Sequence, residues 1–276
     1  MILVAAAGVA GADPRNDKGA GACAGGTYGE CLQRATRLEY GVEGEKKDRK
    51  KAQAMYAAAC AANIPVACTS AGDRAKEAGF DEAAARKWFQ KGCDLDASLC
   101  VSYGFYLEEQ DAPADVKQGV AMLAKACNAG WGLACYKVAD HAKTKVEAAT
   151  WEKKRCEAKD SSDCGRYIRR LWNDEAGLAP AASTKALEAL CDGGEAGACD
   201  AVAQRHLMGQ GTKASRAAAD LWMGKGCDHG ATKLCIVLGK RALMDDNDKA
   251  RATAWFDKAC KAEDADGCDW LARAKK

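Results

Sequence analysis

Apolar residues recur every three to four positions along most of this chain, and short polar stretches interrupt them at regular intervals. This spacing is typical of amphipathic helices, because a helix completes one turn in about 3.6 residues. The interruptions carry Asn, Asp and Gly, which favour turns and helix ends. The pattern therefore predicts a series of short helices joined by tight turns, with residues 28–40, 196–208 and 232–244 among the clearest.

Large and small side chains also fall at fixed distances from cysteines that recur along the chain. Small residues lie eight positions before the first cysteine of a unit: Ala52, Ala85, Gly119, Ala148, Ser183, Ala219 and Ala252. Large residues lie five positions before it, with Ala186 as the exception: Met55, Trp88, Met122, Trp151, Trp222 and Trp255. Small residues also lie four positions after the second cysteine, except at Ile168: Gly72, Gly104, Ala139, Ala203, Gly239 and Ala272. We expect the large residues to be core knobs, and the small positions to let paired helices approach closely and stack.

All 16 cysteines belong to this register. Seven cysteine pairs are eight residues apart, and Cys93 and Cys100 are seven apart. The first cysteines recur at intervals of 29 to 37 residues, which indicates a helical solenoid in which no unit buries its apolar face alone. Residues eight apart on one straight helix are separated by roughly 12 Å. A disulfide needs Cα atoms about 4.4–6.8 Å apart, so a bridge within a pair requires the chain to reverse.

The most regular unit resembles a known repeat. Residues 252–260 read ATAWFDKAC, residues 267–272 read GCDWLA, and residues 85–93 and 219–227 match nearly as well. This pattern resembles the Sel1-like repeat, a relative of the tetratricopeptide repeat, over roughly residues 28–276. A cysteine pair in every unit is similar to the cysteine-rich branch of that family, the secreted Helicobacter cysteine-rich proteins. The resemblance implies an all-α, right-handed solenoid of helix pairs, although the glycine pair frequent between such repeats is suggested only by Gly209 and Gly211.

A local disulfide across each turn is the preferred pairing, although sixteen cysteines permit about two million pairings in principle. Each local bridge closes a turn that helix packing already imposes, and the loop-entropy model values it at roughly 2.5 kcal/mol. The predicted bridges are Cys23–Cys31, Cys60–Cys68, Cys93–Cys100, Cys127–Cys135, Cys156–Cys164, Cys191–Cys199, Cys227–Cys235 and Cys260–Cys268. Structural zinc is the alternative, but its ligands usually stand two to four residues apart. We therefore expect neither a metal nor a cofactor.

Disulfides in such number are typical of an oxidising compartment, so we expect a secreted or periplasmic protein. Residues 1–12 are apolar and end in Ala-Gly-Ala, which resembles the end of a secretory signal peptide, although the positively charged start is missing. A lipid anchor at Cys23 is the alternative. Twelve residues cannot span a bilayer as a helix. We expect residues 13–27 to be a flexible, glycine-rich N-terminus, and residues 28–276 to form a half-repeat followed by seven repeats.

The net charge of +2, with 29% charged residues, gives no footprint for nucleic acid. The cysteine-rich family has been described as penicillin-binding or weakly β-lactamase-like, so a β-lactam hydrolase is the alternative function that the resemblance implies. Serine β-lactamases carry S-x-x-K, S-D-N and K-T-G. None of these motifs occurs, and residues 150–153 (TWEK) are the nearest analogue. His141, His206 and His229 are dispersed over three units, so we expect no catalytic residue.

Recognition is the function that the repeat pattern favours. Solenoids of paired helices offer an extended concave face, typically lined by the first helix of each pair. We expect this chain to act there as a monomeric scaffold that binds a protein or peptide, and a purely structural role at the cell envelope stays open. The predicted contact residues lie outside the knob register: Tyr103, Tyr106, Trp131, Trp172 and Trp270. Trp131 is the most interesting, because a packed role is hardest to supply in a turn between two glycines.

Overall fold

The computed structural model describes residues 14–77, 81–158 and 163–276, and these residues form helices without a β-strand. The helices are α1 (Tyr28–Tyr40), α2 (Arg49–Ala61), α3 (Pro65–Glu77), α4 (Glu82–Leu95), α5 (Cys100–Glu108), α6 (Pro113–Asn128), α7 (Gly132–Asp140), α8 (Lys145–Cys156), α9 (Gly165–Trp172), α10 (Pro180–Asp192), α11 (Ala196–Met208), α12 (Arg216–Asp228), α13 (Thr232–Met244), α14 (Lys249–Lys261) and α15 (Ala265–Ala274). Short 3-10 turns occupy Pro14–Asn16, Gly21–Cys23 and Ala97–Leu99. The all-α class is thereby confirmed.

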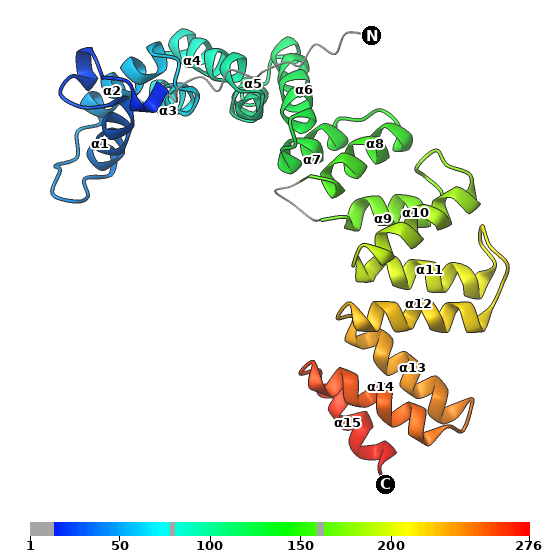
Figure 1. Ribbon diagram of the computed structural model, residues 1–276. Coiled ribbons are helices and arrows are strands. Elements are labelled where there is room, and N and C mark those ends of the chain that lie inside the picture. The colour runs from blue at the N-terminus through cyan, green and yellow to red at the C-terminus, as the bar shows by residue number, and fades with distance from the viewer. Residues whose placement is uncertain (1–13, 78–80, 159–162) are drawn as a thin grey trace, which may run out of the picture. The chain divides into compact units, whose positions relative to one another are not determined.

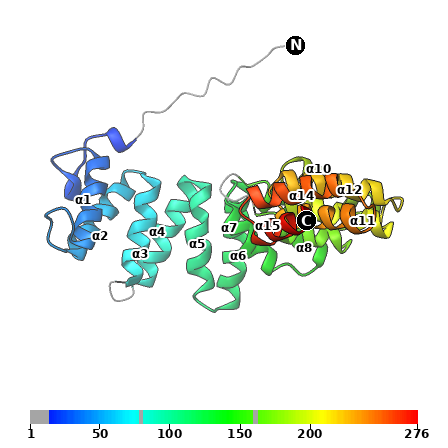
Figure 2. The ribbon, with the colours of Figure 1, turned by 90° about the horizontal axis from the view of Figure 1, so that it is seen from below.

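The fold consists of helix pairs in sequence order, from α2 and α3 to α14 and α15, with α1 before them. We call the even-numbered members first helices and the later odd-numbered members second helices. Contacts divide the chain into two compact units, Met1–Val138 and Ala139–Lys276. Helices α1 to α5 stand side by side in the first unit (Figure 2), and α10 to α15 follow one another as packed neighbours in the second (Figure 1).

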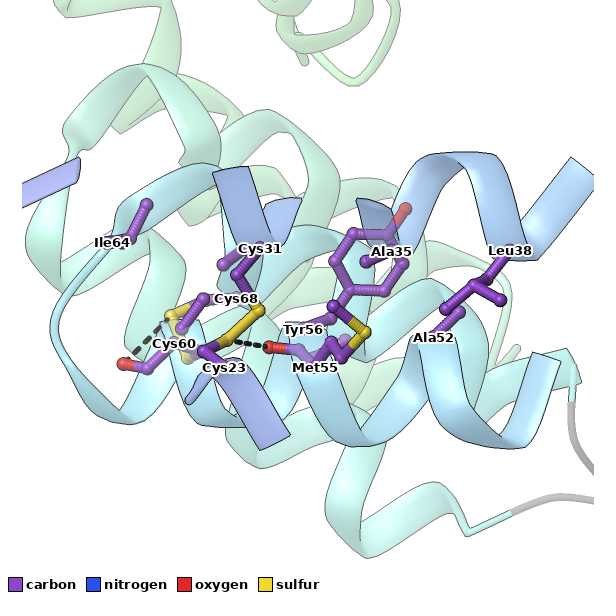
Figure 3. Close-up of a cluster of buried hydrophobic side chains, with 13 residues drawn as sticks. Cys23, Cys31, Ala35, Leu38, Ala52, Met55, Tyr56, Cys60, Ile64 and Cys68 are labelled. Atoms are coloured by element: carbon purple, nitrogen blue, oxygen red, sulfur yellow. Dashed lines mark hydrogen bonds between the residues drawn. A yellow bond between two sulfur atoms is a disulfide. The ribbon is translucent and has the colours of Figure 1, made fainter. Parts of the chain in front are cut away.

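All eight predicted disulfides are present, and each lies within the chain reversal that the spacing requires. Their Cα–Cα distances run from 4.2 to 5.2 Å. Seven bridges join the first helix of a pair to the start of its second helix. The eighth, Cys23–Cys31, ties the segment before α1 to α1 itself, and Cys23 is buried beside α2 (Figure 3).

A residue in the left-handed region closes the turn in five of the pairs. It is the third residue after the first cysteine, and its φ lies between 62° and 100°: Asn63, Gly130, Gly194, Gly230 and Glu263. Glycine pays no steric penalty there, and asparagine tolerates the conformation better than most residues. The shorter turn between α4 and α5 lacks such a residue. Its 3-10 turn is capped instead by Asp96, whose carboxylate accepts a hydrogen bond of 2.8 Å from the Ser98 N–H.

A large, buried side chain recurs at one position of every first helix. It lies four residues before the first cysteine and is at most 4% exposed: Tyr56, Phe89, Leu123, Glu152, Leu187, Met223 and Phe256. Three of these side chains sit against a glycine four residues after the second cysteine of the preceding pair. A Cβ atom placed on that glycine would lie 2.9 Å from Phe89 (Gly72), 2.6 Å from Leu123 (Gly104) or 2.5 Å from Phe256 (Gly239). The glycine therefore leaves the space that the knob fills.

This arrangement corrects the predicted knob position by one residue. Of the residues five before the first cysteine, Met55 is buried, but Trp88, Met122, Trp151, Trp222 and Trp255 are only partly buried. Neighbouring residues on a helix point about 100° apart. When the residue four before the cysteine faces the preceding pair, its tryptophan neighbour must lie at the edge of the interface. The small positions eight before the cysteine are all buried, as expected.

Helix α2 also begins later than its charged sequence suggests. The charged run starts at Glu45, but Asp48 caps α2, with its carboxylate accepting a hydrogen bond of 2.9 Å from the Lys51 N–H. Tyr56 on α2 lies next to Ala35 of α1 (Figure 3) and donates a hydrogen bond of 2.8 Å to Glu39. Burial, together with the Glu39 carboxylate, raises the pKa of Tyr56 to about 12. The tyrosine therefore stays neutral and joins α1 to the first pair.

We predict that Gly239→Ala destabilises the contact between α13 and α14 by about 1–3 kcal/mol, because the new methyl group overlaps Phe256. Hydrogen exchange of the α13 and α14 amides measures the loss locally, which suits a repeat fold that need not unfold in one step. Gly197→Ala is the matched control, since its Cβ would meet no atom closer than Ile168 at 4.0 Å. Unchanged exchange in Gly239→Ala would show that Phe256 does not depend on this space.

Candidate functional site

Two first helices of the second unit form a hollow of about 430 Å³ that we call the tryptophan hollow. Its lining comes from α12 and α14 alone: Asp220, Leu221, Trp222, Gly224, Lys225, Asp228 and Trp255. Leu221 is 72% exposed, although it stands beside two partly buried indoles. Apolar side chains gathered at a hollow on the surface are typical of a binding site rather than of a random surface.

The core register positions both tryptophans. Met223 and Phe256 follow Trp222 and Trp255 directly in sequence, and both are buried as knobs. Each knob fixes its helix rotation, so the preceding indole is held at the border of the hollow. Gly224 lets the second ring approach α12 closely, because a Cβ there would lie 3.4 Å from the Trp255 ring. The hollow is thus built by the same packing that joins the pairs.

Charged residues around the tryptophan hollow are matched in pairs. Lys225 lies 3.9 Å from the centroid of the Trp222 ring, and its ammonium is 2.6 Å from the Asp192 carboxylate. Lys258 repeats this arrangement over Trp255 at 4.7 Å, and its ammonium is 2.7 Å from Asp228. Asp220 is held by Arg241 at 2.6 Å. Because these charges already have partners, the hollow suits an apolar side chain better than a small ion.

Two second helices of the same unit form another hollow of about 390 Å³, which we call the Trp172 hollow. Helix α9 contributes Gly165, Ile168, Arg169 and Trp172, and α11 contributes Gly197, Asp200, Ala201 and Gln204. The mouth is open beside Gly197, where a Cβ would meet no atom closer than Ile168 at 4.0 Å. This hollow brings in one of the predicted contact residues, Trp172, whose ring packs against the core of the unit.

The fully buried Arg205 fixes the end of α9 from which Trp172 projects. Its guanidinium donates to the carbonyl oxygens of Leu171 (2.7 Å) and Trp172 (3.0 Å), and it also pairs with Asp174. Further bonds of 3.0–3.1 Å reach the Pro180 carbonyl and the Thr184 hydroxyl. A cation at these carbonyls interacts favourably with the helix dipole. Arg205 therefore positions Trp172 without touching the hollow.

Asp174 completes this cluster as the carboxylate partner of Arg205. Partial burial alone would raise the pKa of Asp174, but the Arg205 guanidinium and the Gln210 amide, which donates a hydrogen bond of 2.9 Å, lower it below its usual value. Asp174 adopts a φ of 54°, where aspartate and asparagine are among the better tolerated residues. Its charge therefore contributes stability at neutral pH, where it is fully ionised.

The other predicted contact residues are placed differently from one another. Tyr103 and Tyr106 are 2% and 3% exposed, so their rings belong to the core. Their hydroxyls are also engaged, with Gln118 donating to Tyr103 at 3.2 Å. Trp131 is 40% exposed in the turn between α6 and α7 and stays a predicted contact. Trp270 stacks on Phe256, with ring centroids 5.7 Å apart, and Lys240 lies 4.6 Å from its centroid.

The placement of Trp222, Trp255 and Leu221 around the hollow does not follow from the sequence pattern. A large residue at a repeated position usually packs in the core, so the pattern predicts a buried place for both tryptophans. The usable signal was the apolar residue after each of them, Met223 and Phe256, because only one of two adjacent residues can face the preceding pair. Leu221, which directly precedes Trp222, is exposed and extends the apolar lining of the hollow towards solvent.

The residues nearest to a β-lactamase motif serve structural roles. Thr150 donates its hydroxyl to the Val146 carbonyl at 3.0 Å, and Lys153 pairs with Glu157 at 3.4 Å. Glu152 is buried as a knob and binds Arg166 at 2.9 Å and Arg170 at 3.1 Å.

Within the residues that the structure describes, no group of three His, Cys, Asp or Glu side chains could hold a metal ion. In the same residues, no helix is long and apolar enough to cross a membrane.

Comparison with solved structures identifies the fold. The chain is similar to a protective antigen of uropathogenic Escherichia coli that displays an SLR fold, with a TM-score of 0.51 and 18% identity, covering 89% of this chain and 56% of that one. It thus spans just over half of the length of the Escherichia coli protein. A Sel1 repeat protein from Oxalobacter formigenes matches with a TM-score of 0.49 and 20% identity, covering 90% of this chain and 77% of that one. No family model and no curated protein matches the sequence. The first likeness shows a Sel1-like repeat fold.

We predict that Asp174→Asn lowers the stability of the α9–α11 region by about 1–3 kcal/mol at pH 7, because it removes a charge-assisted bond to Arg205. Since the folded-state pKa of Asp174 lies below its unfolded value, this advantage of the wild type is fully present above about pH 4. It should then be lost as the pH falls through the folded-state pKa. Urea unfolding of both forms between pH 7 and pH 3 measures it. A difference independent of pH would contradict an ionic role.

Proposed function

We propose that this chain is an exported repeat scaffold that binds a segment of a partner protein in the tryptophan hollow. An apolar side chain of the partner enters between Trp222 and Trp255, and Leu221 covers it from the solvent side. The first helices of a solenoid line its usual binding face, and both helices of this hollow are first helices. The observation that carries the proposal is the exposure of Leu221 at the edge of two indoles.

The composition of the hollow supports a protein partner. Binding hot spots are enriched in tryptophan and lie in pockets from which neighbouring contacts exclude water. Here the indoles are already held by their knob neighbours, so binding immobilises few additional side chains. The paired lysines and aspartates form a polar rim around this apolar centre, as in protein interfaces generally.

Export is supported by the disulfides. A chain with eight disulfides and no free cysteine is typical of proteins of the periplasm or the extracellular space, because cytosolic thiols are kept reduced. Bridges that each close a short turn also suit a scaffold exposed to proteases outside the cell, since local opening of a pair is restricted.

We predict that Leu221→Asp weakens binding of the partner by about tenfold or more, because the partner's apolar side chain then meets a charge instead of a leucine. The partner is first captured from envelope extract with the oxidised chain, and calorimetry with the purified pair then gives the affinity. Met244→Asp is the matched control, since Met244 is 63% exposed in the same unit but lies at the end of a second helix. Equal weakening by both variants, or by neither, would remove the tryptophan hollow as the binding site.

Export has a separate test that does not need the partner. A membrane-permeant alkylating reagent added to intact source cells should leave all 16 cysteines unmodified, and the chain should be recovered in the extracytoplasmic fraction. Mass spectrometry of the alkylated peptides reads the result. Recovery of alkylated chains from the cytosol would contradict export while leaving the binding site untouched.

A further inference from the structure

We propose that the Trp172 hollow is a second, independent binding site, which takes an extended peptide segment with an apolar residue flanked by one acidic and one basic residue. The acidic side chain would pair with Arg169 on α9, the basic one with Asp200 on α11, and the apolar side chain would rest on Trp172 and Ile168. This site lies on second helices and shares no residue with the tryptophan hollow.

Arg169 is the first observation that carries this inference. Its neighbours Arg166 and Arg170 on α9 both bind the buried Glu152, and Arg166 also binds Asp140 at 2.7 Å. Arg169 is exposed at the wall of the hollow, and within residues 14–77, 81–158 and 163–276 its side chain has neither an ion pair nor a hydrogen bond. One guanidinium of three on this helix is therefore left for a ligand.

Asp200 supplies the opposite charge on the other wall. Its carboxylate accepts a hydrogen bond of 3.3 Å from the Gln204 amide and, among the described residues, meets no cation. Arg169 and Asp200 therefore face one hollow without neutralising each other. A small anion would be repelled by Asp200, and a metal ion would find a single carboxylate. A segment that carries both signs of charge matches the two walls.

The floor of the hollow and its rigidity favour a peptide over a bulkier surface. Trp172 and Ile168 provide apolar contact, while Gly165 and Gly197 bring the backbone of both helices to the rim. Arg205 holds the carbonyl groups at the end of α9, so Trp172 is fixed before binding. A preformed apolar floor between two fixed charges reduces the entropy lost on binding and sets the orientation of the segment.

The proposal is tested by selecting displayed random peptides against the intact, oxidised chain, with counter-selection against Trp172→Ala. The enriched peptides should share an apolar residue flanked by an acidic and a basic one. Arg169→Glu and Asp200→Lys should each weaken a synthesised peptide about tenfold or more. A peptide whose acidic residue is replaced by lysine should regain affinity for Arg169→Glu. Both residues are partly or fully exposed and outside the core, so these variants should fold.

Three results would overturn the proposal. Peptides could fail to enrich over Trp172→Ala, or bind equally well to Arg169→Glu, which would exclude the charged walls. Alternatively, sedimentation could show a dimer that Arg169→Glu dissociates, which would assign the hollow to a second copy of the chain. Leu221→Asp should leave the selected peptides bound, so failure here and failure of the tryptophan hollow are distinguishable.

Discussion

The structure depends on one repeated contact between neighbouring helix pairs. A large side chain four residues before the first cysteine enters space left by a glycine four after the second cysteine of the pair before it, where Phe89 meets Gly72, Leu123 meets Gly104 and Phe256 meets Gly239. No helix pair buries its own apolar face, so this contact supplies the core that a closed domain would have. The disulfides act inside a pair, and the knobs act between pairs.

The same contact positions the residues of the proposed binding surface. A knob fixes the rotation of its helix, and the residue before it is then placed about 100° away, at the edge of the interface. Where that residue is tryptophan, as at positions 222 and 255, an indole is held at the surface by the core beside it. Packing and recognition thus use adjacent residues, and the lysines over these indoles are paired with aspartates of the preceding pair.

Much of the fold follows from the sequence alone, because the repeat displays each constraint several times. Cysteine spacing predicts a chain reversal and a local bridge, and recurrent glycine after the first cysteine fits the left-handed residue that closes the turn. The choice between two adjacent large residues does not follow, since periodicity of about 3.6 residues cannot resolve which neighbour faces inward. Burial of a residue outside the repeated register does not follow either, and the structure puts both Tyr103 and Tyr106 in the core.

Isolated departures from the repeat could not be predicted either. Glu152 takes a knob position. Its carboxylate is buried because Arg166 and Arg170, in the second helix of the same pair, form ion pairs with it. Arg205 on α11 is fully buried because its guanidinium binds carbonyl groups at the end of α9. It also binds the carboxylate of Asp174, which lies just after α9. Such contacts depend on three-dimensional placement of single residues. They are also what gives the Trp172 hollow its rigid floor.

Peptide mapping of the non-reduced protein by mass spectrometry tests the central claim most directly, namely that every bridge is confined to one helix pair or to the segment before α1. The expected intact mass is about 16 Da below that of the reduced chain, since eight bridges remove sixteen hydrogens. Eight cross-linked peptides are also expected, each joining cysteines seven or eight residues apart. A bridge between different pairs, such as Cys68 with Cys93, or a population of free thiols would contradict it.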